Sequence, residues 1–157
     1  MNTLFAEAIA ADIATLERVV EAPTGDLGYG TDLSCVDDLT EDMAEIDPST
    51  ARGIGEAAIR RLTTPRGGLV DDPDYGLDLR GYCNHGVTSE ELRTLASRAS
   101  AELLKDDRID SATVTLSTNT ASTDLRVTVT ITPADPNVAT FALVFAVTDS
   151  AVLIETI

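Results

Sequence analysis

Four aspartates crowd into a short stretch near the middle of the chain, and carboxylates at such spacing can bind a calcium ion. They are Asp71, Asp72, Asp74 and Asp78. A calcium loop of the EF-hand type needs oxygen ligands at positions one, three and five, glycine at six and a bidentate Glu at twelve. Counted from Asp72, glycine falls at position five, and Asn84 stands near the end where an acid is needed. We therefore expect aspartates that accept local backbone hydrogen bonds, and no bound metal.

Combinations of side chains that could catalyse a reaction are sparse. Cleavage of a glycan needs one carboxyl group with a raised pKa and a second carboxylate at a defined separation, beside a cleft that binds sugars. No such pair stands out, and the chain has no Trp and only three Tyr and three Phe to stack on sugar rings. A Ser/His/Asp triad would depend on His85, the only histidine. We expect no enzymatic activity and no cofactor, and a glycan hydrolase is the least favoured alternative.

The two cysteines, Cys35 and Cys83, are far apart in the sequence. Two thiols and one histidine leave a tetrahedral zinc site incomplete. Reduced thiols in a cytosolic setting are the favoured interpretation, and a disulfide between the two cysteines stays open.

The charge balance restricts the class of partner. The chain of 157 residues has 11 Lys and Arg against 27 Asp and Glu, a formal net charge of -16. Nucleic acids and anionic lipids both require cationic groups, so we expect neither as a partner. No run of eighteen apolar residues and no basic leader followed by an apolar stretch is present, and we expect no membrane span and no secretory signal. The expected partners are proteins.

Residues 62–82 link a predicted helix to the rest of the chain and combine several breaks of regular structure. Pro65 and Pro73 exclude helix, because proline has no amide donor and restricts the residue before it. Gly67 and Gly76 allow backbone angles that other residues avoid. Loops of this length in a small domain are typically functional or disordered. Recurring apolar residues favour an ordered loop, and they are Leu69, Val70, Tyr75, Leu77, Leu79 and Tyr82.

Several short motifs occur in a fixed order. Gly30-Thr31-Asp32 comes first and is followed by a predicted helix, a threonine-rich turn through Pro65-Arg66-Gly67, and an acidic turn, Asp72-Pro73-Asp74-Tyr75-Gly76. A second helix and the triplet Asp106-Asp107-Arg108 complete the order. This order resembles the baseplate wedge family of contractile injection machines, which includes lysozyme-like wedge proteins of contractile phage tails and a type VI secretion component. The family pattern has Glu-Pro-Arg at the triplet, so an acid and the arginine are kept here and the proline is lost.

The resemblance implies a structural subunit, present in six copies in the baseplate, that links the wedge core to the first sheath ring. The implied partners are wedge proteins and the sheath protein, with the tube or spike hub as a further candidate. The implied location is the baseplate of a virion or contractile particle assembled in the host cytoplasm. In this interpretation the triplet contacts the wedge core, and Arg108→Ala blocks assembly with little change in melting temperature. The predicted partner-binding residues are Asp106, Asp107, Arg108, Arg66, Gly67, Tyr75, Gly76, Val152 and Ile154. An acidic adaptor or a calcium-binding module is the alternative.

Hydrophobic periodicity predicts three helices followed by strands. An apolar stripe at three and four residue spacing indicates a helix over residues 3–21, with residues 1–25 as an N-terminal element and 26–157 as the main part of one compact domain. Further helices are predicted from Asp47-Pro48 to Leu62 and, after a capping box at Thr88, to Leu104. Alternation predicts strands over 109–117 and 125–132. The fold class is α+β, with three helices packed on one face of a mainly antiparallel sheet.

The end of the chain carries two apolar segments. Residues 140–147 are apolar at nearly every position, which predicts a strand covered on both faces. Residues 151–157 are apolar and short, and two interpretations stay open for them. They either complete the sheet of the domain or leave an edge to which a strand of another protein adds.

Overall fold

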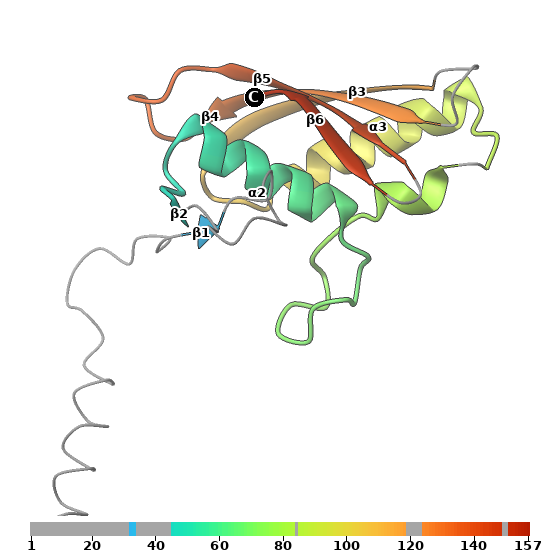
Figure 1. Ribbon diagram of the computed structural model, residues 1–157, viewed down its shortest axis with the longest axis horizontal. Coiled ribbons are helices and arrows are strands. Elements are labelled where there is room, and N and C mark those ends of the chain that lie inside the picture. Colours follow the sequence, from blue (N-terminus) through green and yellow to red (C-terminus); the bar gives the residue numbers. More distant parts are fainter. Residues whose placement is uncertain (1–31, 34–44, 84, 119–123, 149–150) are drawn as a thin grey trace, which may run out of the picture. The chain divides into compact units, whose positions relative to one another are not determined.

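A computed structural model describes residues 32–33, 45–83, 85–118, 124–148 and 151–157 (Figure 1). Contacts divide the chain into two units, residues 1–30 and residues 31–157. All the described residues belong to the second unit. The helix predicted over residues 3–21, Cys35 and Asn84 lie outside the described residues.

The second unit is built on a four-stranded antiparallel sheet whose strands are adjacent in chain order. The strands are β3 (Ile109–Thr118), β4 (Leu125–Pro133), β5 (Phe141–Val147) and β6 (Val152–Thr156). The strict alternation predicted for β4 is confirmed, because its apolar positions are buried and its Thr and Arg positions are exposed or half-buried. Consecutive strands joined by short turns need no crossover, which explains the simple order.

Two α-helices, α2 (Ala51–Thr63) and α3 (Ser89–Leu103), lie on one face of this sheet (Figure 1). Helix α3 begins with the predicted capping box, in which Thr88 and Glu91 satisfy each other's backbone amides. Helix α2 begins one turn later than predicted, because the Thr50 hydroxyl, and not Asp47, accepts the amide of Gly53. The helical residues buried against the sheet are Ile54, Ala58, Ile59, Leu62, Leu95, Ala99 and Leu103.

The predicted α+β class agrees with the structure, but the prediction of three helices on the sheet is wrong. Within the described residues two α-helices cover the sheet, together with one turn of 3-10 helix, η1 (Leu79–Tyr82). An amphipathic stripe does not specify the surface on which it packs, so the sequence pattern of residues 3–21 could not locate that segment on this sheet. The helix that was predicted to run to Leu104 ends at Leu103, and Leu104 is half exposed.

The strand β5 differs from its prediction as well. Phe145 and its neighbours at alternate positions face the helices and are buried. On the opposite face, Ala142 is exposed, and Val144 and Ala146 are half-buried. The prediction of a strand covered on both faces is therefore wrong. Small apolar residues on a solvent face have the same appearance in a sequence as buried ones.

A separate two-stranded ladder, β1 (Asp32–Leu33) with β2 (Glu45–Ile46), accompanies α2. Asp32 forms an ion pair with Arg60 in the last turn of α2, and Ile46 is buried. Asp32, the last residue of the Gly-Thr-Asp motif, is thereby linked to the helix that leads into the loop of residues 64–78.

Candidate partner-binding site

The loop of residues 64–78 leaves the end of α2, projects away from the helices and returns beside α2 (Figure 1). The returning segment of the loop is fixed by the amides of Leu77 and Asp78, which donate to the carbonyls of Arg61 (3.2 Å) and Thr64 (3.1 Å). Further out, the amide of Gly67 donates to the carbonyl of Pro73 at 2.9 Å. The two sides of the loop are therefore hydrogen-bonded to each other, and the loop is ordered as the sequence predicted.

Gly76 is required where the loop returns. Its φ is +100°, and a Cβ built on it would lie 2.3 Å from the carbonyl oxygen of Thr64. Both the positive φ and the close approach exclude any residue with a side chain unless the backbone moves. The glycine of the acidic turn thus allows the loop to close against the end of α2.

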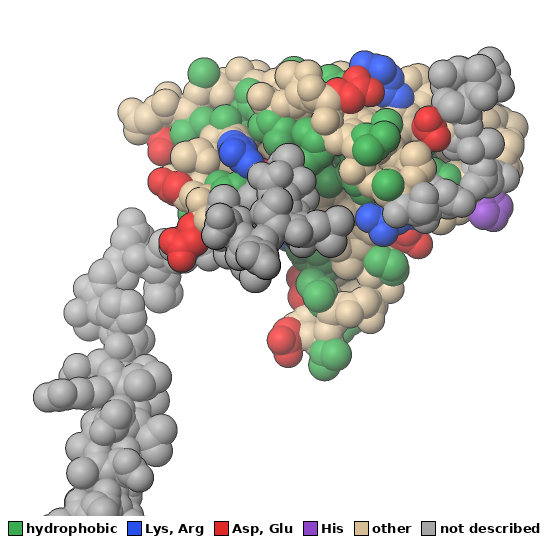
Figure 2. All heavy atoms as spheres, in the orientation of Figure 1, with side chains coloured by type: hydrophobic (Ala, Val, Ile, Leu, Met, Phe, Trp, Pro, Cys, Tyr) green, Lys and Arg blue, Asp and Glu red, His purple; other side chains and the backbone are tan. Residues whose placement is uncertain are grey.

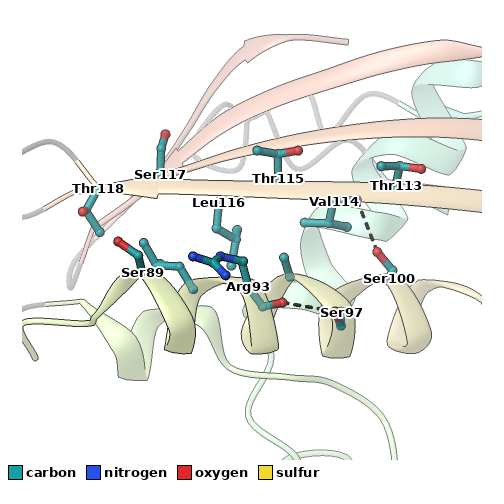
Figure 3. Close-up of a pocket in the computed structure, with 12 residues that line it drawn as sticks. Ser89, Arg93, Ser97, Ser100, Thr113, Val114, Thr115, Leu116, Ser117 and Thr118 are labelled. Carbon is teal, nitrogen blue, oxygen red and sulfur yellow. Dashed lines mark hydrogen bonds between the residues drawn. The ribbon is translucent and has the colours of Figure 1, made fainter.

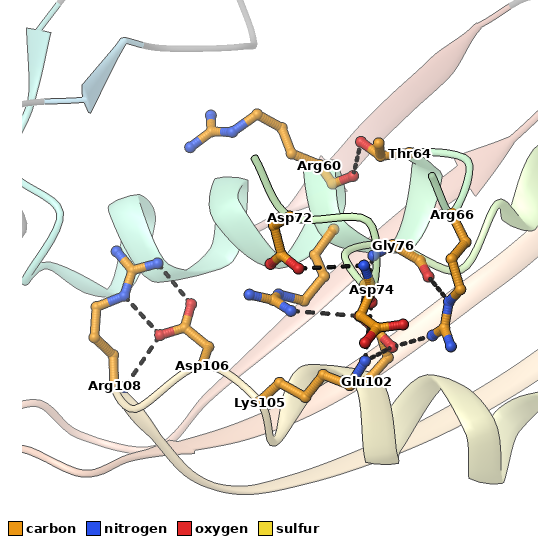
Figure 4. A network of polar contacts seen from close by, with 11 residues as sticks. Arg60, Thr64, Arg66, Asp72, Asp74, Gly76, Glu102, Lys105, Asp106 and Arg108 are labelled. Atoms are coloured by element: carbon orange, nitrogen blue, oxygen red, sulfur yellow. Dashed lines mark hydrogen bonds and ion pairs between the residues drawn. The ribbon is translucent and has the colours of Figure 1, made fainter. Parts of the chain in front are cut away.

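The carboxylate of Glu102, on α3, binds the base of the loop (Figure 4). Its side chain is 3% exposed. It accepts the amide of Gly76 at 3.0 Å and the guanidinium of Arg66 at 2.6 Å. Lys105 Nζ lies 2.9 Å and Arg61 Nη1 3.3 Å from its oxygens. One buried carboxylate therefore joins α2, both sides of the loop and α3.

The surroundings of Glu102 favour its charged form. Burial disfavours the carboxylate, but hydrogen bonds from Lys105 and the Gly76 amide and the charges of Lys105 and Arg66 outweigh it. The pKa of Glu102 is therefore lower than its ordinary value. At neutral pH the group is an anion that holds three cationic side chains.

Arg66 and Arg61 bind the loop in different ways. Arg66 Nε donates to the carbonyl oxygen of Gly76 at 3.1 Å, so its guanidinium bridges that carbonyl and Glu102. The guanidinium of Arg61 lies 4.4 Å from the ring centroid of Tyr75, a cation–π contact. Burial raises the pKa of the Tyr75 hydroxyl despite the nearby arginines. Arg66, Gly67, Tyr75 and Gly76 therefore all contribute to the shape of one loop.

The side chains of the triplet that follows α3 differ in their contacts. Arg108 binds Asp106 through two parallel bonds, Nε to Oδ1 at 2.9 Å and Nη2 to Oδ2 at 2.6 Å. Its Nη1 also donates to the carbonyl of Pro48 at 3.1 Å. The side chains of Arg108 and Asp106 are 13% and 11% exposed, whereas Asp107 is exposed. Arg108 thus joins the start of β3 to the residues before α2. Within the triplet, Asp107 is the residue whose side chain is exposed to solvent.

Electrostatic interactions connect the triplet to the Glu102 cluster, which consists of Glu102, the amide of Gly76 and the side chains of Arg61, Arg66 and Lys105. Burial opposes ionisation of Asp106, but the hydrogen bonds and charge of Arg108, with a further contribution from Arg61, lower the pKa of its carboxyl group. Figure 4 shows the Asp106 and Arg108 pair beside the loop base. The predicted residues of the loop and the triplet therefore belong to one polar region between α2 and α3.

Val152 and Ile154 lie elsewhere, in β6. They pair with Val147 and Phe145 of β5, and both side chains pack against the hydrophobic core. The amide of Thr148 donates to the carbonyl of Ala151 at 2.9 Å. Alternation along the ladder then turns the amides of Val152 and Ile154 away from β5. The tail completes the sheet of the domain, and its outer backbone groups form a sheet edge.

A groove of about 770 Å³ runs between α3 and β3, the strand at the other edge of the sheet (Figure 3). Leu92, Ala96 and Leu116 give it an apolar floor, and Arg93 is its charged residue. The Ser100 hydroxyl accepts the amide of Val114 at 3.2 Å, so one edge amide of β3 is already bound within the domain. The sequence did not indicate this groove.

Sequence reasoning also missed Glu102, Arg61 and Lys105. A signal for Glu102 was present, because it follows Leu95 and Ala99 at helical spacing on the stripe of α3 that is otherwise apolar. An acid at such a position is either unfavourable or paired. Arg61 and Arg66 come from distant parts of the chain, and spacing could not identify them. Lys105 lies three residues after Glu102, a spacing at which side chains near a helix can pair.

The aspartates of the acidic turn form local contacts. Asp72 accepts the amide of Asp74 at 3.2 Å, and Asp78 accepts the amide of Gly81 at 3.3 Å. Among the described residues, no group of three His, Cys, Asp or Glu side chains is placed to hold a metal ion. In the same part of the chain, no helix has the length and apolar character needed to cross a membrane. The Cys83 thiol is buried and donates to the carbonyl of Val147 at 3.3 Å.

No protein-family model matches the chain, and no curated protein matches it.

Proposed function

We propose that the chain is a structural subunit of the baseplate wedge of a contractile tail or tail-like injection machine. Six copies link the wedge core to the first sheath ring, in a particle assembled in the host cytoplasm. The partners in this proposal are the wedge proteins and the sheath protein. The support is the resemblance of the ordered motifs together with the way in which their parts meet.

The observation that carries the proposal is the convergence of these motifs on Glu102. Arg66 belongs to the threonine-rich turn and Gly76 to the acidic turn, and both bind this one carboxylate on the following helix. Asp32, from the first motif, pairs with the helix that leads into the loop. Motifs with a shared structural role are expected to meet in space, whereas unrelated matches to short patterns are scattered. The convergence therefore favours one structural unit over chance similarity.

The sheet edge of β6 supports the link to the sheath. Backbone groups of Val152 and Ile154 point outward from the last strand, and β6 has no proline and no lysine to protect it. An extended segment of a sheath subunit can add there as a further strand, because free backbone amides and carbonyls provide its hydrogen bonds. The opposite edge is less available, since Ser100 occupies an amide of β3 and α3 lies along it.

Deletion of the gene in the cells that produce the particle tests the proposal. Electron microscopy is expected to show tubes or baseplate fragments without an attached sheath, and a wild-type copy is expected to restore complete tails. A second test uses Val152→Pro, which removes one outward amide at the first residue of a strand, where proline is tolerated. Sheath attachment is expected to be lost, while the far-UV circular dichroism of the purified variant is retained. Complete sheathed tails in the deletion strain would reject the proposed function.

A further inference from the structure

The outer end of the loop of residues 64–78 presents apolar side chains to solvent. Val70 is 94% and Leu69 43% exposed. Among the large hydrophobic residues that the structure describes, Val70 has the greatest exposure. Figure 2 shows hydrophobic and acidic side chains together at the end of this projection. We define residues 69–74 as the loop tip.

Hydrogen bonds hold both ends of the loop tip, although the tip makes no contact with the core. The amide of Gly68 donates to the carbonyl of Pro65 at 2.9 Å, and the amide of Tyr75 donates to that of Asp72 at 3.1 Å. Lys105 Nζ donates to the carbonyl of Asp74 at 3.0 Å. A loop that is already ordered loses little conformational entropy when it binds. Leu69 and Val70 are adjacent apolar side chains at the end of a projecting loop, and their exposure leaves them available to a binding partner.

Charge restricts what the loop tip can contact. Asp71, Asp72 and Asp74 are exposed next to the apolar pair, and residues 69–74 contain no cation. The nearest cations at the base, Arg66 and Lys105, are bound to Glu102. An anionic lipid surface would repel three aspartates. A second copy of this chain is disfavoured by its net charge of -16.

We infer that the loop tip inserts Leu69 and Val70 into an apolar pocket of another protein, whose rim carries Arg or Lys side chains that pair with Asp71 and Asp72. Buried apolar anchors contribute most of the affinity in such contacts, and complementary charges at the rim fix the orientation. The inference depends on the loop alone. It does not depend on the proposed baseplate function, and it concerns a different surface from the β6 edge.

Site-specific crosslinking of the full chain in the cells that make it tests this inference. The photoreactive residue p-benzoylphenylalanine replaces Val70, and adducts are isolated after irradiation and mapped by mass spectrometry. The expected result is one adduct with a different protein, joined at a segment that contains apolar residues together with Arg or Lys. An adduct with a second copy of this chain, an adduct with lipid, or no adduct would overturn the inference.

Two companion changes examine the anchor and the charges. Leu69→Asp in the crosslinking chain is expected to lower adduct yield about tenfold, because it puts a charge in the apolar pocket. Leu104→Asp is the matched control, since Leu104 is a similarly exposed leucine outside residues 69–74, and the yield is expected to stay unchanged. Asp71→Lys with Asp72→Lys is expected to lower the yield several-fold. Equal yields from the Leu69→Asp and Leu104→Asp chains would also overturn the inference, whatever the result of the Val152→Pro test.

Discussion

The base of the loop of residues 64–78, where Arg66 and Gly76 bind Glu102, and the loop tip differ in the interactions that fix their conformation. At the base, Glu102 is 3% exposed and binds the amide of Gly76, two arginines that are distant in the sequence, and Lys105, which lies three residues further along the chain. At the tip, Val70 is 94% exposed, and the chain is fixed by local hydrogen bonds and by one bond from Lys105 to the carbonyl of Asp74. The base therefore has the buried interactions that determine stability, whereas the apolar side chains of the tip, Leu69 and Val70, contribute little to stability. This difference separates residues that hold a site in place from residues that are available to a partner.

The largest effect is expected at Gly76, where the backbone of the base is most restricted. Gly76→Ala is expected to lower the free energy of unfolding by roughly 3 kcal/mol, because a Cβ would add a backbone clash to an unfavourable positive φ. Gly67→Ala is the matched control, since Gly67 also has a positive φ but a Cβ there would meet nothing within 4 Å. Its expected cost is about 1 kcal/mol. Chemical denaturation of both variants measures the difference, and equal costs would show that the clash at Gly76 is relieved by movement of the loop.

Removal of the buried charge at the base is expected to have the next largest effect. Glu102→Gln keeps the size of the side chain but leaves Arg61, Arg66 and Lys105 without their anion. The expected loss is about 2 kcal/mol, below the range for a fully buried pair, because Arg66 and Lys105 are half exposed and partly screened by water. Glu90→Gln, at an exposed position of the same helix, is expected to change stability by less than about 0.5 kcal/mol. Similar losses in the two variants would mean that Glu102 does not hold the base.

The same charge predicts how stability depends on pH. The folded pKa of Glu102 is below its ordinary value of 4.5, so folding favours the ionised form. Its contribution is fully present above the unfolded pKa and is lost as the pH falls through the lower folded pKa. Urea denaturation at a series of acidic pH values is expected to show a shallower acid decline for Glu102→Gln than for the wild type. Parallel declines would assign the acid sensitivity to other groups, of which Asp106 is the first candidate.

The sequence predicted those parts of the structure that depend on local patterns. The capping box at Thr88, the alternation in β4 and the ordered loop with a required Gly76 all follow from neighbouring residues, and all are present. The Glu102 cluster could not be predicted as a whole, because Arg61 and Arg66 are 41 and 36 residues away and only the fold brings them to Glu102. Its pairing with Lys105 is local, at a separation of three residues. The prediction that both faces of β5 are covered was wrong for a related reason. Hydropathy does not show whether a second layer covers small apolar residues.

Asp106 and Arg108 form a second ion pair, between residues that are close in the sequence. Loss of this pair is expected to lower the free energy of unfolding by less than loss of the Glu102 charge. Arg108→Ala removes the bidentate bond and leaves the carboxylate of Asp106, 11% exposed, with weaker partners. The expected loss is about 1.5 kcal/mol, which differs from the small change that a charge at a helix end predicts. Arg108→Lys keeps the charge but not the planar fork and is expected to recover less than half of the loss. Thermal denaturation measures both, and an unchanged melting temperature in Arg108→Ala would mean that the side chain is available to a partner after all.

The smallest effect on stability is expected at the tip. Val70→Ser replaces a side chain that has almost no contact with the domain, so the free energy of unfolding is expected to change by less than about 0.5 kcal/mol. The amide of Tyr75 and the other backbone groups that shape the tip are untouched by this change. Urea denaturation of Val70→Ser beside Gly76→Ala therefore compares the two ends of one loop directly. A loss of 1 kcal/mol or more at Val70, well outside the usual range for surface substitutions, would mean that the tip packs on the protein in solution. In that case the distinction between a structural base and an available tip would no longer hold.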